Sequence, residues 1–416
     1  MSVREYLSEN LLDNNFVKLI SPVYTAQLIL GTSCLVMSGN LVSTITFYQK
    51  IYSIIWIITV SGSFYYFVLS YYNSYYDKEK TLFYTFAFGL LVQYVSYLLN
   101  IFHARFFKSE ESVGVFLKIQ KIDRFLEIKN LNVVDPGYYL NRLWLGYIIT
   151  NFGSGFSIFV YSQIDKPLFT IPMGCAILSL YLELVLTGSC IYYLAQRLQH
   201  LNTIIEKNIV NKKHKVEIRK IEVPGFPVTA GEAHKIIGLK DLTKILTSIL
   251  KLFHESSNLF TFEIFNLVVT MLIWTFLVIE STVVGLRSKL VSLLASVILM
   301  LWIAFYFTQL MSVAISCDWF AKQVRDTKRL AVHALSVCHE DKDADIRKAA
   351  WELLQLIEFE KPVFSVYGIF TLNTRLPIQL ISVITTNIKI TTTNFLAKMD
   401  AEVLPILQSP SDVSER

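Results

Sequence analysis

The sequence predicts an all-α membrane protein with seven transmembrane helices and a cytosolic N-terminus. Its 416 residues are 53% hydrophobic and only 17% charged, whereas about 25% of the residues of an ordinary soluble domain are charged. Seven apolar stretches reach the length of about 20 residues that a helix needs to cross a bilayer. Lys and Arg are concentrated in alternate loops, and this asymmetry orients a membrane protein.

The seven predicted spans follow one another along most of the chain. They cover residues 52–72, 82–104, 143–164, 168–195, 261–285, 290–316 and 377–397. An earlier apolar stretch, 22–47, is interrupted by many polar residues. We therefore expect a helix there that lies at the inner membrane surface or packs among the others, and that does not span.

The positive charges assign the orientation. Of the 38 Lys and Arg residues, 30 lie in four segments that alternate with three loops carrying only 5. The four segments are 1–51, 105–142, 196–260 and 317–376. Because loops rich in Lys and Arg stay cytosolic, the N-terminus is expected inside and the C-terminus outside. This orientation is opposite to that of a G-protein-coupled receptor, and it argues against that class.

Two segments outside the predicted spans carry an apolar stripe at helical spacing. Within 234–260 and again from Ile346 to Ile357, apolar residues recur every three or four positions, which is typical of amphipathic helices. The fifth span is therefore expected to continue into the cytosol as a helix. The stripes, including Leu353 and Leu354, either face another subunit or pack within one subunit.

The last predicted span is unusually polar. Residues 377–384 are apolar, but Thr386, Asn387, Thr391 and Asn394 follow. At about 100° per residue, the last three of these lie within about 60° of one another. Such a helix cannot face lipid all round. Either it lines a water-filled path enclosed by several subunits, or its outer half lies beyond the hydrocarbon.

Four stretches spread over most of the chain carry a family resemblance. They are Gln120–Leu126, Tyr193–Asn202, Ile245–Phe265 and Pro362–Asn373. The last is the most specific, because it is close to an apolar-Gly-Phe-x-Leu-Asn run that precedes a final membrane span. In this order and with this topology, the chain resembles the insect gustatory receptors, which share their seven-helix plan with the odorant receptors.

The resemblance implies a ligand-gated, non-selective cation channel assembled as a homotetramer, or together with related receptor subunits. Four last spans would line a central pore, and the fifth to seventh helices would extend into a cytosolic anchor domain that joins the subunits. Each subunit would hold an outward-facing pocket for a small tastant, a sugar or a bitter compound. The alternatives are a polytopic membrane transporter and a divergent, non-conducting chemoreceptor subunit.

The implied organisation has five segments. Residues 1–51 form a cytosolic N-terminal segment with a membrane-associated helix, and 52–285 hold the first five transmembrane helices, the ligand pocket and long cytosolic loops. Residues 286–376 form the sixth helix and the anchor. The pore-lining helix is 377–397, and 398–416 form an extracellular tail.

The pore residues are implied by the signature of the family's final helix, which is Thr-Tyr, five apolar residues and Gln-Phe. The nearest match is Thr386-Asn387, six residues and Asn394-Phe395, which gives the pore and gate residues Thr386, Asn387, Thr391, Asn394 and Phe395. Lys389 lies inside this segment, on the opposite side of the helix from Asn387. Four lysines that faced a narrow path would repel cations.

Candidates for the tastant pocket are aromatic or polar residues inside the spans. Glu280 lies about one and a half turns beyond Trp274, and a carboxylate beside an indole face suits a polyol or a cationic alkaloid. Tyr161, Glu183 and Gln309 in neighbouring spans complete the set. Alternatively, Glu280 reaches the outer interface and Trp274 faces lipid.

An enzyme is not expected. The chain lacks the common nucleotide-binding, zinc-protease and hydrolase motifs, and no His pairs with a second metal ligand at helical spacing inside a span. We therefore expect no cofactor and no metal. The expected partners are a small-molecule tastant, permeant cations and membrane lipid, with no nucleic acid. The expected location is the plasma membrane of a sensory neuron, as a multi-pass protein.

Overall fold

The computed structural model describes residues 12, 14–126, 142–143, 145–150, 153, 171–218, 239–287, 293–337, 344–386 and 389. Its labelled elements are α2 (Asn14–Ile29), β1 (Val36–Ser38), β2 (Leu41–Ser43), α3 (Phe47–Tyr75), α4 (Lys80–Phe102), η1 (His103–Phe107), α5 (Ser109–Phe125), α7 (Ile171–Ile218), α8 (Leu239–Arg287), α9 (Leu293–Val337), α10 (Ala344–Phe359), β3 (Ser365–Val366) and β4 (Phe370–Thr371). Residues 145–150 and 375–386 are also helical. Helices dominate these residues, as predicted.

Within the described residues, five helical segments are long and apolar enough to cross a membrane. They are Phe47–Asn73, Lys80–Phe107, Ile171–Lys207, Leu242–Gly285 and Ser296–Val337. These correspond to the first, second, fourth, fifth and sixth predicted spans. The third predicted span, 143–164, is helical at 145–150 and lies mostly outside the described residues. The last, 377–397, is helical through residue 386.

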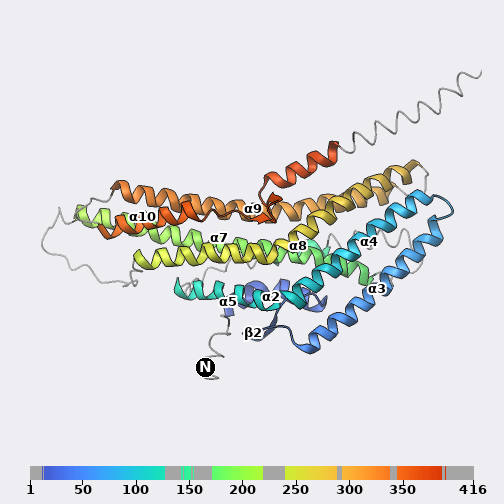
Figure 1. Cartoon of the computed structure of the whole chain (residues 1–416), viewed down its shortest axis with the longest axis horizontal. Coiled ribbons are helices and arrows are strands. Elements are labelled where there is room, and N and C mark those ends of the chain that lie inside the picture. Colours follow the sequence, from blue (N-terminus) through green and yellow to red (C-terminus); the bar gives the residue numbers. More distant parts are fainter. Residues whose placement is uncertain are drawn as a thin grey trace, which may run out of the picture.

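Three helices are far longer than a bilayer requires. α7, α8 and α9 contain 48, 49 and 45 residues. At about 1.5 Å per residue, each is about 70 Å long, against a hydrocarbon core of about 30 Å. They pack against one another along the long axis of the molecule, with the α3–α4 hairpin toward one end and α10 toward the other (Figure 1).

We call the end that contains α10 the distal lobe, which comprises 239–260, 317–337 and 344–359. α10 packs against α9 and α8. The apolar stripe predicted for this helix is buried there, as Ile346, Leu353 and Ile357 show. The stripe of α10 therefore packs within one subunit and does not face another subunit.

The stretch at 22–47 is a helix followed by a hairpin. α2 ends at Ile29, and β1 pairs with β2 in antiparallel register from Val36 opposite Ser43. Gly39 sits at the turn with φ 60°, a conformation that glycine adopts without steric cost. α2 itself packs against α7. The expected helix packed among the others is therefore present up to residue 29. The hairpin that follows it was not predicted.

A buried arginine ties this N-terminal region to α3. Arg105 lies in the π-helical turn η1. Its Nε donates to the carbonyl of Ser33 at 2.9 Å, and its Nη1 donates to the carbonyl of Gln49 at 2.7 Å. A buried cation is costly unless its donors are satisfied, and these carbonyls supply partners. Burial raises the pKa of the neighbouring Cys34 thiol to about 12, so this thiol stays protonated and unreactive at neutral pH.

Candidate functional site

A buried polar cluster lies where α4, α7 and α9 meet. Gln93 of α4 donates from Nε2 to the hydroxyl of Tyr306 on α9 at 3.4 Å. The ring of Tyr181 on α7 lies 4.7 Å from that of Tyr306. Gln309 follows Tyr306 by about one turn of α9 and is completely buried. We refer to these four side chains as the polar cluster.

Several atoms in and beside the polar cluster have no hydrogen-bond partner among the described residues. They are Oε1 and Nε2 of Gln309, Oε1 of Gln93 and the hydroxyl of Tyr97 on α4. A buried donor or acceptor without a partner costs about 1–3 kcal/mol. Such a group in a native protein calls for an explanation, and a site that binds a small molecule supplies one.

Aromatic rings pack beside the polar cluster. Phe305 lies 4.7 Å from Tyr181 and 5.6 Å from Tyr147, which belongs to the helical residues 145–150. None of these described aromatic or amide side chains carries a formal charge. Amides that donate and accept, set beside ring faces, suit a small neutral molecule with polar groups.

Trp274 of α8 packs against α4 next to the polar cluster. A Cβ added at Gly89 would lie 2.7 Å from Cζ3 of this indole, so only glycine allows this approach. Phe86 lies beside the same indole at 5.9 Å. The indole Nε1 has no partner within the described structure. Gly89 precedes Gln93 by one helical turn, so Trp274 and the polar cluster contact the same stretch of α4.

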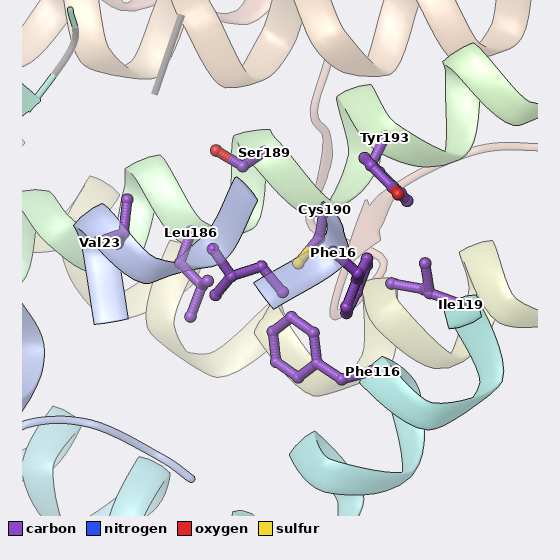
Figure 2. Close-up of a pocket in the computed structure, with 9 residues that line it drawn as sticks. Phe16, Val23, Phe116, Ile119, Leu186, Ser189, Cys190 and Tyr193 are labelled. Atoms are coloured by element: carbon purple, nitrogen blue, oxygen red, sulfur yellow. The ribbon is translucent and has the colours of Figure 1, made fainter. Parts of the chain in front are cut away.

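A second feature is a small apolar cavity between α2, α5 and α7 (Figure 2). Phe16, Phe116 and Cys190 converge on it, and the hydroxyl of Ser189 points away. Its volume of about 20 Å³ is close to the ~10–15 Å³ that a single water molecule requires. This cavity is therefore too small for a sugar or an alkaloid.

Two of the stretches that carry the family resemblance meet at the junction of α5 and α7. The guanidinium of Arg197 donates to both carboxylate oxygens of Asp123, at 2.6 Å from Nε and 3.0 Å from Nη2. The Tyr193 hydroxyl donates to the same carboxylate at 2.7 Å, and the Arg197 guanidinium lies 3.4 Å from the centre of the Tyr193 ring. These residues are structural, because they fasten the two helices.

The helix at 375–386 contacts its own subunit mainly at its start. Leu376 and Pro377 are buried, but most residues from 378 to 386 are exposed. The Thr386 hydroxyl donates to the carbonyl of Ser382 at 2.9 Å. In the part of the chain that the structure describes, no cluster of His, Cys, Asp and Glu side chains could hold a metal ion.

Comparison with known proteins identifies the family. The family described as 7tm chemosensory receptor matches residues 20–390, which is most of the chain. The chain belongs to the 7tm chemosensory receptor family. This membership agrees with the relationship to insect chemoreceptors that was predicted from the four sequence stretches. A search of curated protein sequences found no match.

Solved structures show the fold of this receptor. The insect olfactory receptor OR5 from Machilis hrabei is 11% identical, with a TM-score of 0.61 over 91% of this chain and 99% of that chain. The structure of OR5 in complex with eugenol is 10% identical, with a TM-score of 0.63 over 91% of this chain and all of that chain.

The ligand residues predicted from the sequence lie in different parts of the receptor. Gln309 belongs to the polar cluster. Trp274 is buried against Gly89 and so does not face lipid, and Glu280 is exposed. Six positions at about 100° each place Trp274 and Glu280 about 120° apart around α8. The indole and the carboxylate therefore do not face one site.

The remaining predicted residues divide between described and undescribed parts. Glu183 is buried in α7, where its Oε1 accepts from Nε2 of Gln27 on α2 at 3.1 Å. Tyr161 lies outside the described residues. Of the predicted pore and gate residues, Thr386 is described and exposed, and the others lie outside the described residues, namely Asn387, Thr391, Asn394 and Phe395.

Sequence reasoning missed three members of the polar cluster. Gln93 satisfies the criterion that selected Gln309, since both are amides inside an apolar span. Tyr181 and Tyr306 are two of 22 tyrosines, and the sequence does not distinguish them from tyrosines that face lipid or the membrane interface.

Proposed function

We propose that this receptor is a gustatory-type, ligand-gated, non-selective cation channel. In this proposal, a small tastant opens it by binding in an outward-facing pocket among the transmembrane helices. The observation that carries the proposal is the polar cluster, where the buried amides of Gln93 and Gln309 lie beside tyrosine rings. These amides have atoms without a hydrogen-bond partner among the described residues. Membership of the chemosensory receptor family and the likeness to OR5, which was solved with eugenol, support it.

The chemistry of the polar cluster favours a neutral ligand with hydroxyl or carbonyl groups. Each amide offers an acceptor oxygen and two N–H donors, and tyrosine rings pack against the apolar face of a ring-shaped ligand. These properties fit a sugar or an uncharged bitter compound. Glu280, which would favour a cationic alkaloid, lies elsewhere and is exposed.

We assign ion conduction to the last helix. Ile378, Ile381 and Val383 expose apolar side chains on it, so in a membrane it requires lipid or other subunits around it. Four copies would enclose a path lined by Thr386, Asn387, Thr391 and Asn394, with Phe395 as an apolar gate. A homotetramer, or a tetramer formed with related receptor subunits, meets this requirement. In this proposal, the assembly lies in the plasma membrane of a sensory neuron, with its N-terminus in the cytosol.

A second candidate is a divergent chemoreceptor subunit that does not conduct. It is favoured by Lys389, which is exposed in the last helix. Four such lysines directed at the axis would repel cations. Replacing Lys389 with Leu distinguishes the cases, because cation conductance would rise only if the lysines face the path.

Patch-clamp recording tests the channel proposal. Cells that express the chain are exposed to sucrose, fructose, caffeine, quinine and eugenol, and a cation current is expected with at least one compound. Gln309→Leu keeps the size of the side chain but removes its amide. We expect the half-activating concentration to rise at least tenfold, which corresponds to about 1.4 kcal/mol of binding free energy.

Gln199→Leu is the matched control, since it removes an exposed amide from α7. It should shift the half-activating concentration less than twofold. Equal responses of wild type, Gln93→Leu and Gln309→Leu would exclude the polar cluster as the ligand site. A wild-type chain that reaches the cell surface without any current would favour the non-conducting subunit, and uptake of a compound without current would favour a transporter.

A further inference from the structure

The last helix begins at a fixed point on α9. The Asp318 carboxylate accepts two hydrogen bonds at Oδ2, from the backbone N–H of Thr374 at 3.0 Å and from the Thr374 hydroxyl at 2.5 Å. Oδ1 of Asn373 accepts the N–H of Arg375 at 3.0 Å. The first turn of the helix is therefore capped both by its own chain and by α9.

The contact with α9 is unusual for a helix cap. The first N–H groups of a helix lack partners within the helix, and a carboxylate near them is favoured by the helix dipole. A neighbouring Asn or Thr commonly fills this role. Here Asp318 lies 56 residues earlier in the chain, so the cap is a tertiary link between two transmembrane elements.

Beyond its first turn, the described part of the last helix has few side chains packed against its own subunit. From 378 to 386, Ile384 is buried and most other residues are exposed. Figure 1 shows this helix, in red, leaving α9 and standing apart from the long helices. The position of its described part therefore depends on how its first turn is attached.

On the other side of the link, Asp318 is held firmly. The adjacent Trp319 lies 4.7 Å from Tyr192 of α7, and Phe320 stacks on Phe253 of α8 at 4.2 Å. α9 is one uninterrupted helix through this region. Gln309 precedes Asp318 by nine residues, which is about 13 Å along the axis at ~1.5 Å per residue.

We propose that Asp318 is a positioning residue that couples α9 to the last helix. A displacement of α9 at the polar cluster moves Asp318 with it, and the two bonds to Thr374 pass that displacement to the start of the last helix. This inference rests on the proposed channel function for its gating readout. Coupling of this kind requires energetic evidence, because proximity alone does not establish it.

A double-mutant cycle on the currents supplies that evidence. With the compound that gives the largest wild-type current, Asp318→Ala and Thr374→Val should each shift the half-activating concentration at least tenfold. The double variant should shift it no further than the larger single change. Thr374→Ser, which keeps the hydroxyl, should stay within twofold of wild type. Asp326→Asn is the matched control, since this α9 aspartate bonds Arg329 of its own helix.

Additive shifts, or shifts below twofold for both single variants at equal surface expression, would overturn the proposal. If Asp318→Ala does not reach the cell surface, the comparison of Thr374→Val with Thr374→Ser decides the result. Equal responses of these two variants would count against the coupling.

Hydrogen exchange on the purified receptor provides a readout that needs no ligand. In Asp318→Ala, the amides of residues 374–376 should exchange at least tenfold faster, and those of α10 should not change. A wild type without current would contradict the channel proposal alone, and the exchange result would then decide whether Asp318 holds the first turn. Unchanged exchange at 374–376 would overturn the inference.

Discussion

At the scale of single residues, the pair formed by Asp123 and Arg197 shows how one carboxylate fastens two helices. Both side chains are nearly buried, with 12% and 8% exposed. Two charge-assisted hydrogen bonds join the carboxylate and the guanidinium, and the Tyr193 ring packs against the guanidinium. These contacts offset the cost of burying the two charges. Removing one partner of a buried pair leaves the other charge uncompensated, so each depends strongly on the other.

Asp123→Ala is therefore expected to destabilise the receptor by about 3–5 kcal/mol. Thermal unfolding in detergent measures this as a large fall in Tm, together with reduced surface expression. Glu111→Ala is the control, since Glu111 bonds Lys108 one turn away on an exposed surface and such pairs contribute about 0–1 kcal/mol. Equal effects of the two changes would contradict the structural role of Asp123.

Gly89 provides a second prediction at this scale. In Gly89→Ala, the new Cβ would meet Cζ3 and Cε3 of Trp274 at 2.7 and 2.8 Å. Because that indole is rigid and buried, overpacking should cost about 1–3 kcal/mol. Gly62→Ala in α3 meets nothing within 4 Å and should gain about 0.5–1 kcal/mol instead. The Tm of Gly89→Ala should thus fall, and the Tm of Gly62→Ala should rise. A shift of both Tm values in the same direction would contradict the close contact between Gly89 and Trp274.

At the scale of elements, α10 has two apolar faces with different roles. The inner face buries Leu353 and Ile357 within the subunit. The outer face exposes Trp351 by 57% and Phe359 by 88%, and the β3–β4 turn exposes Ile369 by 67%. Large exposed apolar side chains on a part that extends beyond the bilayer indicate an interface. We therefore propose that this outer surface contacts other subunits.

A triple change, Trp351→Ser, Phe359→Ser and Ile369→Ser, should weaken the assembly without unfolding the subunit. Sizing in detergent should move from the proposed tetramer toward monomer, and the Tm of the monomer should stay close to that of wild type. Leu353→Asp is the contrasting variant, because a charge at this buried site costs several kcal/mol and should unfold the distal lobe. Unchanged sizing of the triple variant would place the interface elsewhere.

Comparing elements shows what sequence patterns can predict. Five spans were located because an apolar run of about 20 residues is itself the physical requirement for crossing. Whether the stripe of α10 packs within the subunit or against another subunit was not predicted, since a stripe repeats in the same way whether its partner is internal or external. The hairpin after α2 was missed because apolar residues such as Leu35 and Val42 are buried there just as in a helix.

The candidate site follows the same logic. Gln309 could be chosen as a candidate because it is a polar side chain inside an apolar span. Trp274 and Glu280 lie on different faces of α8, because a spacing of six residues turns the second side chain by about 120°. Contacts between spans, such as Gln93 with Tyr306, depend on how each helix is rotated. One sequence does not specify these rotations.

At the scale of the whole molecule, the distribution of positive charge predicts the orientation. Epitope tags before Met1 and after Arg416 test this on intact cells. We expect the second tag to be stained and the first to be stained only after permeabilisation, because 30 of the 38 Lys and Arg residues lie in the segments assigned to the cytosol. Staining of the N-terminal tag on intact cells would reverse the orientation.

The buried Arg105 has a consequence for how the chain is made. Its carbonyl partners, Ser33 and Gln49, leave the ribosome before it, and at about 5–20 residues per second the 56 residues that separate Gln49 from Arg105 take several seconds. Arg105 is therefore added to the chain after both of its acceptors have been synthesised. Asp318, by contrast, precedes its partner Thr374 in the chain, so it is synthesised before that partner exists. The bonds of Arg105 in η1 can thus form as soon as Arg105 is available, whereas attachment of the last helix requires the synthesis of Thr374.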